Sequence, residues 1–141
     1  MKSRSVEFAR RELSALAALA TVVARDMAGD IAEVSALAAT ALEEGGKLLF
    51  ARQIRALGRP GDVLFLHSTS GNSVNLLRAA ETARAGGLVT VGLLGRGGGL
   101  LSAAVDHAVI VPTDAGARAQ ELHLAIGHIV CQLVEERLNA D

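Results

Sequence analysis

A short polar run near the middle of the chain combines residue types that bind phosphate. His67 is followed by four hydroxyl residues placed around Gly71 and Asn72, and these are Ser68, Thr69, Ser70 and Ser73. The run leads into a stretch with helical spacing, and the unpaired amides at the start of a helix favour an anion. The composition fits either a phosphate-binding loop or an ordinary hydroxyl-rich turn with a helix cap at Ser73. The run contains no lysine, so it is not a Walker loop.

The last predicted helix, 116–138, carries an amide and two imidazoles. Gln120 and His128 are separated by about 12 Å along a helix and about 80° around it, so their side chains could meet one ion or one substrate. The alternative is that His128 is an ordinary packed histidine on an apolar helix. His123 lies about 60° from Gln120 in the opposite sense, and we expect it to be structural or at a subunit contact. Glu121 could orient His128 or pair across an interface.

A glycine-rich turn follows the predicted strand 88–94 and consists of Gly95, Arg96 and glycines 97 to 99. Its spacing does not match the dinucleotide fingerprint, so no nucleotide cofactor is expected. We interpret it as a flexible turn at the sheet edge. Arg96 could reach a phosphate from there, although a solvated side chain is the simpler interpretation. Three charged residues further along are expected to be solvated: Asp106, Asp114 and Arg118. Of these, Asp114 could also cap the last helix.

The elements that must position these groups alternate between strands and helices. Short apolar runs predict strands at 48–50, 63–66, 88–94 and 108–111, and helical spacing predicts helices at 52–58, 73–85, 98–104 and 116–138. This alternation indicates an α/β fold, a three-layer α/β/α sandwich with a parallel sheet. Ligands of such sheets bind beyond the carboxyl ends of the strands, which is where the polar run lies.

The first 44 residues are rich in Ala and Leu and predict one long helix or two, with a break at Gly29–Asp30. The apolar faces of these helices are wider than a small domain covers alone. We therefore expect them to pack against the same helices of another subunit. Residues 45–141 would form the α/β core, so that 1–141 is a single domain.

Composition excludes several classes of function. The chain has 141 residues, with 14 Lys and Arg against 15 Asp and Glu. It therefore lacks the net positive charge that would attract nucleic acid or an anionic membrane. Aromatic residues make up 2% of the chain, which leaves few platforms for stacking bases. A domain of this length buries roughly two thirds of its unfolded surface, and it needs neither disulfides nor a metal to fold.

The sequence also favours a cytoplasmic location. The longest stretch without Asp, Glu, Lys, Arg or His, 13–24, would form about 18 Å of helix, which is short of the roughly 30 Å of bilayer hydrocarbon. No apolar signal-peptide core follows the charged start of the sequence. Cys131 is the single cysteine, which fits a reducing compartment.

Several of these strings resemble the sugar isomerase (SIS) domain family and, more narrowly, its phosphoheptose isomerases. The resemblance runs in collinear order from about Gln53 to Leu138. It is carried by 61–64 leading into 68–73, by 91–98, by Val111–Pro112, and by 120–123 together with His128. It implies a SIS-like sheet of flavodoxin-like topology and a homotetramer.

The resemblance also implies a reaction and the residues that carry it. The family interconverts sedoheptulose 7-phosphate and D-glycero-D-manno-heptose 7-phosphate through an enediol, and Ser68, Thr69, Ser70 and Ser73 would bind the sugar phosphate. His128 would act as acid or base, and Gln120 would orient the sugar. Zinc is a further expectation, because the positions matching Gln120 and His128 are metal ligands in zinc-containing members. The family tends to have a small or apolar residue at the position of His67, which we interpret as a local packing variant.

One unit of the family pattern is missing at the junction of Phe50 and Ala51. In the family a Gly-Asn-Gly-Gly-Ser loop, a helix with a His and the catalytic Glu, and a further strand-loop unit stand at this place. Either a natural deletion removed half of the active site, or the sequence joins the two ends of an omitted segment. We favour the omission, because both flanks match and a sheet without this unit would expose a long edge.

Two other functions compete with the isomerase. The first is a non-catalytic adaptor or sugar-phosphate-binding protein of the same fold, of the type that associates with the replication initiator; the presence of His128 argues against it. The second is the sensing domain of a regulator, which would normally be fused to a DNA-binding segment, and residues 1–44 do not resemble one.

Overall fold

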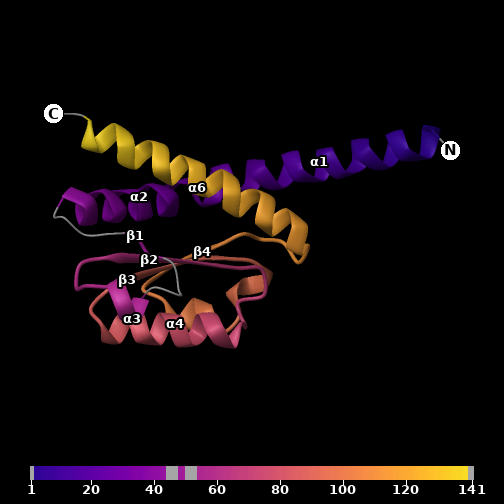
Figure 1. The fold of residues 1–141 in the computed structure, drawn as a ribbon. Coiled ribbons are helices and arrows are strands. Elements are labelled where there is room, and N and C mark those ends of the chain that lie inside the picture. Colours follow the sequence, from indigo (N-terminus) through magenta and orange to yellow (C-terminus); the bar gives the residue numbers. More distant parts are fainter. Residues whose placement is uncertain (1, 44–47, 50–53, 140–141) are drawn as a thin grey trace.

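The computed structural model describes residues 2–43, 48–49 and 54–139 (Figure 1). Two long helices come first, and strands then alternate with helices up to a long final helix. The elements in chain order are α1 (Lys2–Asp26), α2 (Ala28–Glu43), β1 (Leu48–Leu49), α3 (Ile54–Leu57), β2 (Val63–Ser68), α4 (Val74–Ala85), β3 (Val89–Leu94), the 3₁₀ turn η2 (Arg96–Gly98), α5 (Leu101–Ala104), β4 (His107–Ile110) and α6 (Gly116–Leu138).

The four strands form one parallel sheet in the order β1-β2-β3-β4. Val63 pairs with Val89 and Val91 pairs with His107, so the strands are only slightly staggered. A parallel sheet forms here because each pair of strands is joined by a helical crossover rather than by a tight turn. All four carboxyl ends therefore lie at the same edge of the sheet.

Helices cover both faces of this sheet. Alternate residues of β2 divide between the faces: Val63 and Phe65 pack on the side of α2 and α6, whereas Leu64 and Leu66 pack on the side of α4. Figure 1 shows α2 and α6 on one side of the strands and α3 and α4 on the other. The prediction of a three-layer α/β/α sandwich is confirmed.

The strand order differs in one respect from the flavodoxin-like topology that the resemblance implied. A flavodoxin-like sheet reverses its strand order once, and the reversal distributes the crossover helices over both faces. The four described strands instead follow one another in chain order, and α4 and α5 cover the same face. The opposite face is covered by α2, which precedes the sheet, and by α6, which follows it.

The N-terminal helices confirm the predicted helical segment, but the break between them lies at Met27 and not at Gly29–Asp30. The amide of Met27 donates to the carbonyl of Val23 at 2.9 Å, and Met27 is buried against the core. Gly29 and Asp30 fall in the first turn of α2, where an acidic residue interacts favourably with the helix dipole. In Figure 1, α1 extends well beyond the sheet.

The remaining predicted elements are present with small shifts at their ends. The predicted helix 98–104 is divided between the 3₁₀ turn and α5, and the helix predicted at 52–58 is described only as Ile54–Leu57. The junction of Phe50 and Ala51 lies outside the described residues. No helix within the described ranges combines the length and apolar character needed to cross a bilayer.

Candidate functional site at the carboxyl edge of the sheet

The polar run forms the loop between β2 and α4, and two of its hydroxyl groups hold the loop in shape. The Ser68 hydroxyl oxygen accepts a hydrogen bond from the Gly71 amide at 2.9 Å, and the Ser70 hydroxyl oxygen accepts one from the Asn72 amide at 3.3 Å. Ser68 is buried, whereas Thr69 and Ser70 are half-buried. Each hydroxyl oxygen that accepts in this way keeps its own proton to donate, so the loop can still offer donors to an anion.

Ser73 lies at the start of α4, as predicted, but it caps the helix through its backbone. Its φ and ψ of −68° and 116° are extended, and its carbonyl accepts hydrogen bonds from the amides of Leu76 and Leu77. The hydroxyl of Ser73 makes no capping hydrogen bond. The first-turn amides of α4 are thus not occupied by this side chain, which is the condition that an anion at a helix start requires.

The glycine-rich turn packs directly against the polar loop. The Leu101 amide donates to the Gly71 carbonyl at 2.9 Å, and the Leu100 amide donates to Asn72 Oδ1 at 3.0 Å. A Cβ atom added at Gly71 would overlap the carbonyl of Gly98, and one added at Gly99 would lie 2.6 Å from the carbonyl oxygen of Ser70. The expectation of a flexible turn is therefore wrong: the glycines let two backbones approach more closely than side chains would permit.

Gly95 brings the start of α6 to the same place. Its amide donates to the carbonyl of Ser68 at 3.0 Å. A Cβ atom at Gly95 would lie 2.9 Å from the carbonyl oxygen of Thr69 and 3.1 Å from the Cβ of Ala119. Ala119 of α6 therefore packs close to the polar loop, and Gln120, the residue that follows it, is exposed.

Gln120 and His128 are both exposed on α6, so the alternative of a packed His128 is wrong. The buried face of α6 includes Leu122, His123 and Ile126, and His128 lies about 160° around the helix from Ile126. Leu124, 62% exposed, stands midway between Gln120 and His128. Residues four apart share one helix face, so these three side chains form a ridge, and His128 faces away from the sheet of its own chain.

His123 occupies the sheet-facing side of α6, as a structural residue would. It is 4% exposed, its ring packs edge to face on that of His67, and its Nε2 has no hydrogen-bond partner among the described residues. Burial lowers the pKa of His123, opposed by a hydrogen bond with the backbone of Leu94. Burial of part of the His67 ring, and then the charge of His123, lower the pKa of His67. Both rings are therefore neutral near pH 7.

Arg118 and Glu121 on α6 are paired charges, which corrects two sequence expectations. Arg118 is 18% exposed and binds Glu12 of α1 at 2.8 Å as well as Glu121. It is therefore not a solvated charge, and Glu121 pairs with Arg118 rather than with His128. Hydrogen bonding to Arg118, opposed by desolvation, lowers the pKa of Glu12.

The two aspartates behave differently from expectation as well. Asp106 is not merely solvated: it accepts hydrogen bonds from the amide and the hydroxyl of Thr90, at 2.9 and 2.6 Å. Asp114 does not cap α6, because the cap position is Ala115 and no side-chain hydrogen bond caps that end.

The roles of Asn72 and Gly95 could not be predicted from the sequence. Both act through contacts with segments that lie 24 to 28 residues away, and local spacing does not report such contacts. The available signal was the pairing of a hydroxyl-rich loop with a glycine cluster, each at the end of a neighbouring strand.

The donors for zinc are incomplete within the described residues. Zinc takes three or four protein ligands, and Gln120 and His128 offer two from one helix. Across the described ranges, no group of three or more His, Cys, Asp or Glu residues is placed to hold a metal. These two side chains fit part of a zinc site, and further ligands would have to come from elsewhere.

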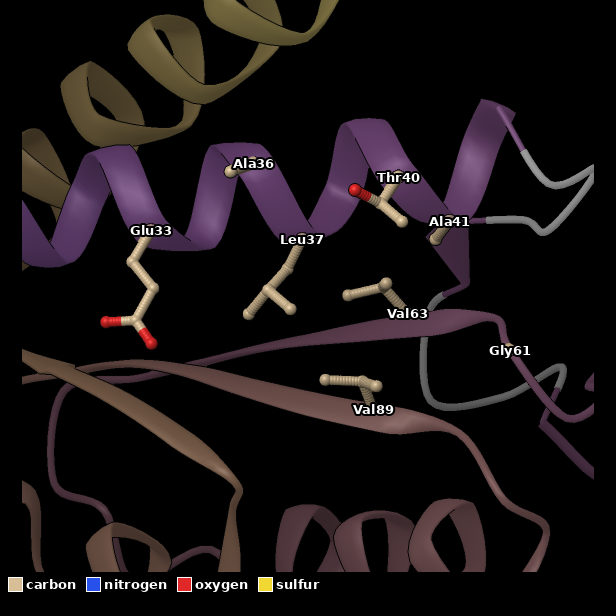
Figure 2. A pocket seen from close by; sticks show the side chains of 8 residues that line it. All are labelled: Glu33, Ala36, Leu37, Thr40, Ala41, Gly61, Val63 and Val89. Carbon is tan, nitrogen blue, oxygen red and sulfur yellow. The ribbon is translucent and has the colours of Figure 1, made fainter.

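A cavity of about 360 Å³ lies between α2 and the sheet, at the opposite edge from the polar loop (Figure 2). Val63 and Val89, the first residues of β2 and β3, form its floor, and most of its other side chains are apolar. Glu33 stands at one end of the cavity, and its Oε1 lies 3.6 Å from Nδ1 of His107. The cavity holds none of the predicted site residues, so it is not the candidate site.

Comparison with known proteins shows which family the chain resembles. The family model described as "SIS domain" matches residues 12–95. A curated phosphoheptose isomerase of Akkermansia muciniphila is 45% identical over 106 residues, which cover 75% of this chain and 56% of that protein. One of Chlorobaculum parvum is 49% identical over 107 residues, covering 75% and 51%. The chain thus spans about half the length of the curated relatives it matches.

Solved structures share the fold. A phosphoheptose isomerase from Francisella tularensis superposes with a TM-score of 0.89 at 23% identity, covering 94% of this chain and 98% of that chain. One from Neisseria gonorrhoeae also has a TM-score of 0.89 at 23% identity, covering 92% and 98%. These similarities establish the architecture around the polar loop.

Proposed function

The chain belongs to the SIS-domain family, and from that premise we propose that it is an aldose-ketose isomerase, a phosphoheptose isomerase of heptose biosynthesis. The reaction would interconvert sedoheptulose 7-phosphate and D-glycero-D-manno-heptose 7-phosphate. One observation carries the proposal: the loop 68–73, which carries the four hydroxyls, is locked against the glycine turn and lies close to Ala119 near the start of α6. The curated relatives of that name, up to 49% identical, support the choice of substrate.

The phosphate of the sugar would bind at the polar loop. Ser68, Thr69, Ser70 and Ser73 offer hydroxyl donors there, and the amides at the start of α4 point into the same region. Hydrogen bonds to an ionised phosphate are stronger than those between neutral groups. A loop without lysine can therefore hold the phosphate dianion through its hydrogen-bond donors and the dipole of α4.

The isomerisation needs a group that removes a proton next to the carbonyl and a group that protonates the carbonyl oxygen. His128 would be one of them, since histidine is the side chain that most often serves as a general acid or base and this one is exposed. Gln120 would hydrogen-bond the sugar near its reacting end. The second acid or base would be a carboxylate supplied from outside the described residues.

The site would be completed in a homo-oligomer, for which we propose a tetramer. His128 faces away from its own sheet, so it can act only on a substrate held against the outer side of α6. The helix also carries exposed apolar surface: α6 has four exposed large apolar side chains, Leu124, Ile129, Leu133 and Leu138. Exposed apolar surface of this kind is buried in subunit contacts.

The single SIS domain would be longer than 141 residues, with an additional segment between Phe50 and Ala51. The share of the curated relatives that this chain spans supports this proposal, as does the missing carboxylate. The mass of the intact natural protein tests it. A mass several kDa above 14.5 kDa is expected, and a mass of 14.5 kDa would refute it.

Zinc is the proposed metal, with Gln120 and His128 as two of its ligands. When bound, a zinc ion would polarise the substrate carbonyl. Elemental analysis of the purified protein tests this, because metal content should fall in both Gln120→Ala and His128→Ala. The proposed location is the cytoplasm, where a reducing environment preserves the exposed free thiol of Cys131.

The decisive experiment incubates the protein with sedoheptulose 7-phosphate, with and without a chelator. Turnover is expected in the wild type, and His128→Ala should lower it by about 100-fold or more. Gln132→Ala is a matched control, because Gln132 lies one turn further along α6 and its side chain contacts Glu136. Absence of turnover under every metal condition would refute the isomerase.

The alternative is a non-catalytic SIS-domain protein that binds sugar phosphates as an adaptor. It is favoured by one observation: within the described residues, no group of three or more His, Cys, Asp or Glu side chains is placed to hold a metal ion. The two functions differ in the same assay, because an adaptor would bind sedoheptulose 7-phosphate without converting it.

A further inference from the structure

Arg96 is held in an unusual conformation at the rim of the polar loop. Its φ is 48°, in the left-handed region, and it is the non-glycine residue with a positive φ among those described. The neighbouring positions 97 to 99 are glycines, for which such angles carry no penalty. A non-glycine residue in this region is strained and persists when surrounding contacts fix it, often at a functional site.

Two hydrogen bonds fix Arg96 to the segment that leads into α6. Its amide donates to the carbonyl of Thr113 at 3.1 Å, and its side-chain Nε donates to the carbonyl of Asp114 at 2.9 Å. The guanidinium is thus anchored through Nε, while the side chain remains exposed. Its two Nη groups make no hydrogen bond or ion pair with the residues that the structure describes.

The residues on both sides of Arg96 touch the polar loop. Gly95 lies against the carbonyl of Thr69, and Gly98 lies against the backbone of Gly71. Arg96 therefore stands at the rim of the loop that carries the four hydroxyls. The other arginine near this edge, Arg118, is already neutralised by Glu12 and Glu121, whereas Arg96 contacts backbone carbonyls and no described carboxylate.

From this juxtaposition we propose that the Nη groups of Arg96 bind the phosphate of the substrate and make the site selective for phosphorylated sugars. The inference rests on the proposed function of the same loop. A phosphate carries about −1.5 to −2 charges at pH 7, and hydroxyls and amides solvate it without cancelling that charge. A planar guanidinium supplies both the charge and two parallel donors, and anchoring through Nε fixes its orientation before the ligand arrives.

The competing role for Arg96 is that of a structural clamp between the glycine turn and the 113–114 segment. A clamp would stabilise the loop for every ligand alike. A phosphate-binding group would discriminate between ligands that differ only in the phosphate. The two roles are therefore separated by comparing matched ligands.

The experiment measures dissociation constants by calorimetry for sedoheptulose 7-phosphate, inorganic phosphate and unphosphorylated sedoheptulose. The variants are Arg96→Gln, Arg96→Lys and Arg96→Gly, the last of which removes the guanidinium while relieving the positive φ. Arg59→Gln is the matched control, because Arg59 is an exposed arginine before β2, at the opposite edge of the sheet. Thermal unfolding of each variant is recorded in parallel.

We expect Arg96→Gln and Arg96→Gly to weaken binding of the sugar phosphate roughly 10- to 100-fold. Arg96→Lys should retain part of the affinity, and Arg59→Gln should retain all of it. The wild-type affinity should also fall more steeply with added salt than that of Arg96→Gln. Affinity for unphosphorylated sedoheptulose should be the same in the wild type and all variants.

The proposal is overturned by an unchanged sugar-phosphate affinity in Arg96→Gln, or by an equal loss for both sugars. It is also overturned if the wild type binds none of the phosphorylated ligands. Turnover is scored separately: arginine-dependent binding without turnover would leave this proposal standing and refute the isomerase.

Discussion

The rings of His67 and His123 lie edge to face, with their centroids 5.9 Å apart and their planes at 72°. His67 ends the apolar part of β2, and His123 is buried on the sheet-facing side of α6. The contact joins the strand that precedes the polar loop to the helix that carries Gln120 and His128. Its strength should depend on pH, because both rings are neutral when packed.

Acidification should destabilise the fold through this pair. The folded-state pKa of each histidine lies below the ordinary value of 6.5, chiefly because of burial. The unfolded chain therefore binds protons more readily, and the stabilisation that is present above about pH 6.5 is lost as the pH falls through the folded-state pKa values. Urea unfolding at a series of pH values between 8 and about 5 should show this loss.

The matched variants are His123→Gln and His128→Gln. His123→Gln should flatten the pH dependence below pH 6.5, since the buried titrating group is gone. His128→Gln removes an exposed histidine and should leave the slope unchanged. Equal slopes in the wild type and His123→Gln would show that the pair does not control acid stability.

Gly71→Ala should destabilise the protein. The φ of Gly71 is +66°, and an added Cβ would overlap the carbonyl of Gly98. The expected loss is roughly 1–3 kcal/mol in the free energy of unfolding, together with weaker binding of sugar phosphates. Gly127→Ala is the control, because Gly127 lies within α6 with no atom within 4 Å of an added Cβ. It should stabilise the protein by about 0.5–1 kcal/mol, measured by the same denaturant titration.

Asn72→Ala tests the connection between the polar loop and the glycine turn. Its Oδ1 accepts the amide of Leu100 at 3.0 Å, so truncation leaves that amide to water and should cost about 1 kcal/mol. Hydrogen exchange at Leu100 should accelerate, and the dissociation constant for sedoheptulose 7-phosphate should rise. Asn75→Ala, on the exposed side of α4, should change neither. Unaltered exchange in Asn72→Ala would mean that the hydrogen bond does not hold the turn.

Leu124→Glu tests the role of the outer ridge of α6. A carboxylate in place of a 62% exposed leucine adds no strain to the isolated chain, but it would be buried in a subunit contact. Light scattering should therefore show a smaller assembly than for the wild type, with the helical content unchanged. Asn75→Glu adds the same charge to the outside of α4 and should leave the assembly intact. A wild type that is monomeric at micromolar concentration would also contradict the proposed oligomer.

The layers of the fold could be predicted because each depends on local pattern. Alternating burial along β2 follows from the sequence around Val63 and Leu64, and the long apolar spacing of 116–138 defines α6 within a residue. The sequence pattern predicts the break between α1 and α2 at Gly29, but the break lies at Met27. Burial of the Met27 side chain decided the position, and burial is a tertiary property.

The candidate site was predictable in its composition and not in its assembly. The hydroxyl loop lies at the carboxyl edge because parallel strands end there, as general rules require. Its fit to the glycine turn depends on backbone contacts between Gly71 and Gly98, and the pairing of Arg118 with Glu12 joins residues 106 positions apart. No periodicity encodes such long-range pairs.

The packing of α2 beside α6 determines the order in which the two faces of the sheet can be covered during synthesis. One side of the sheet is covered by a helix from each end of the chain, and α6 spans Gly116–Leu138. While the chain is being synthesised, α4 can dock as soon as β3 has left the ribosome, because they are neighbours in sequence. The valine-rich side around Val91 and Val109 must wait for the last helix. Until then only α2 can cover it, and apolar surface left exposed in a nascent chain is prone to aggregation.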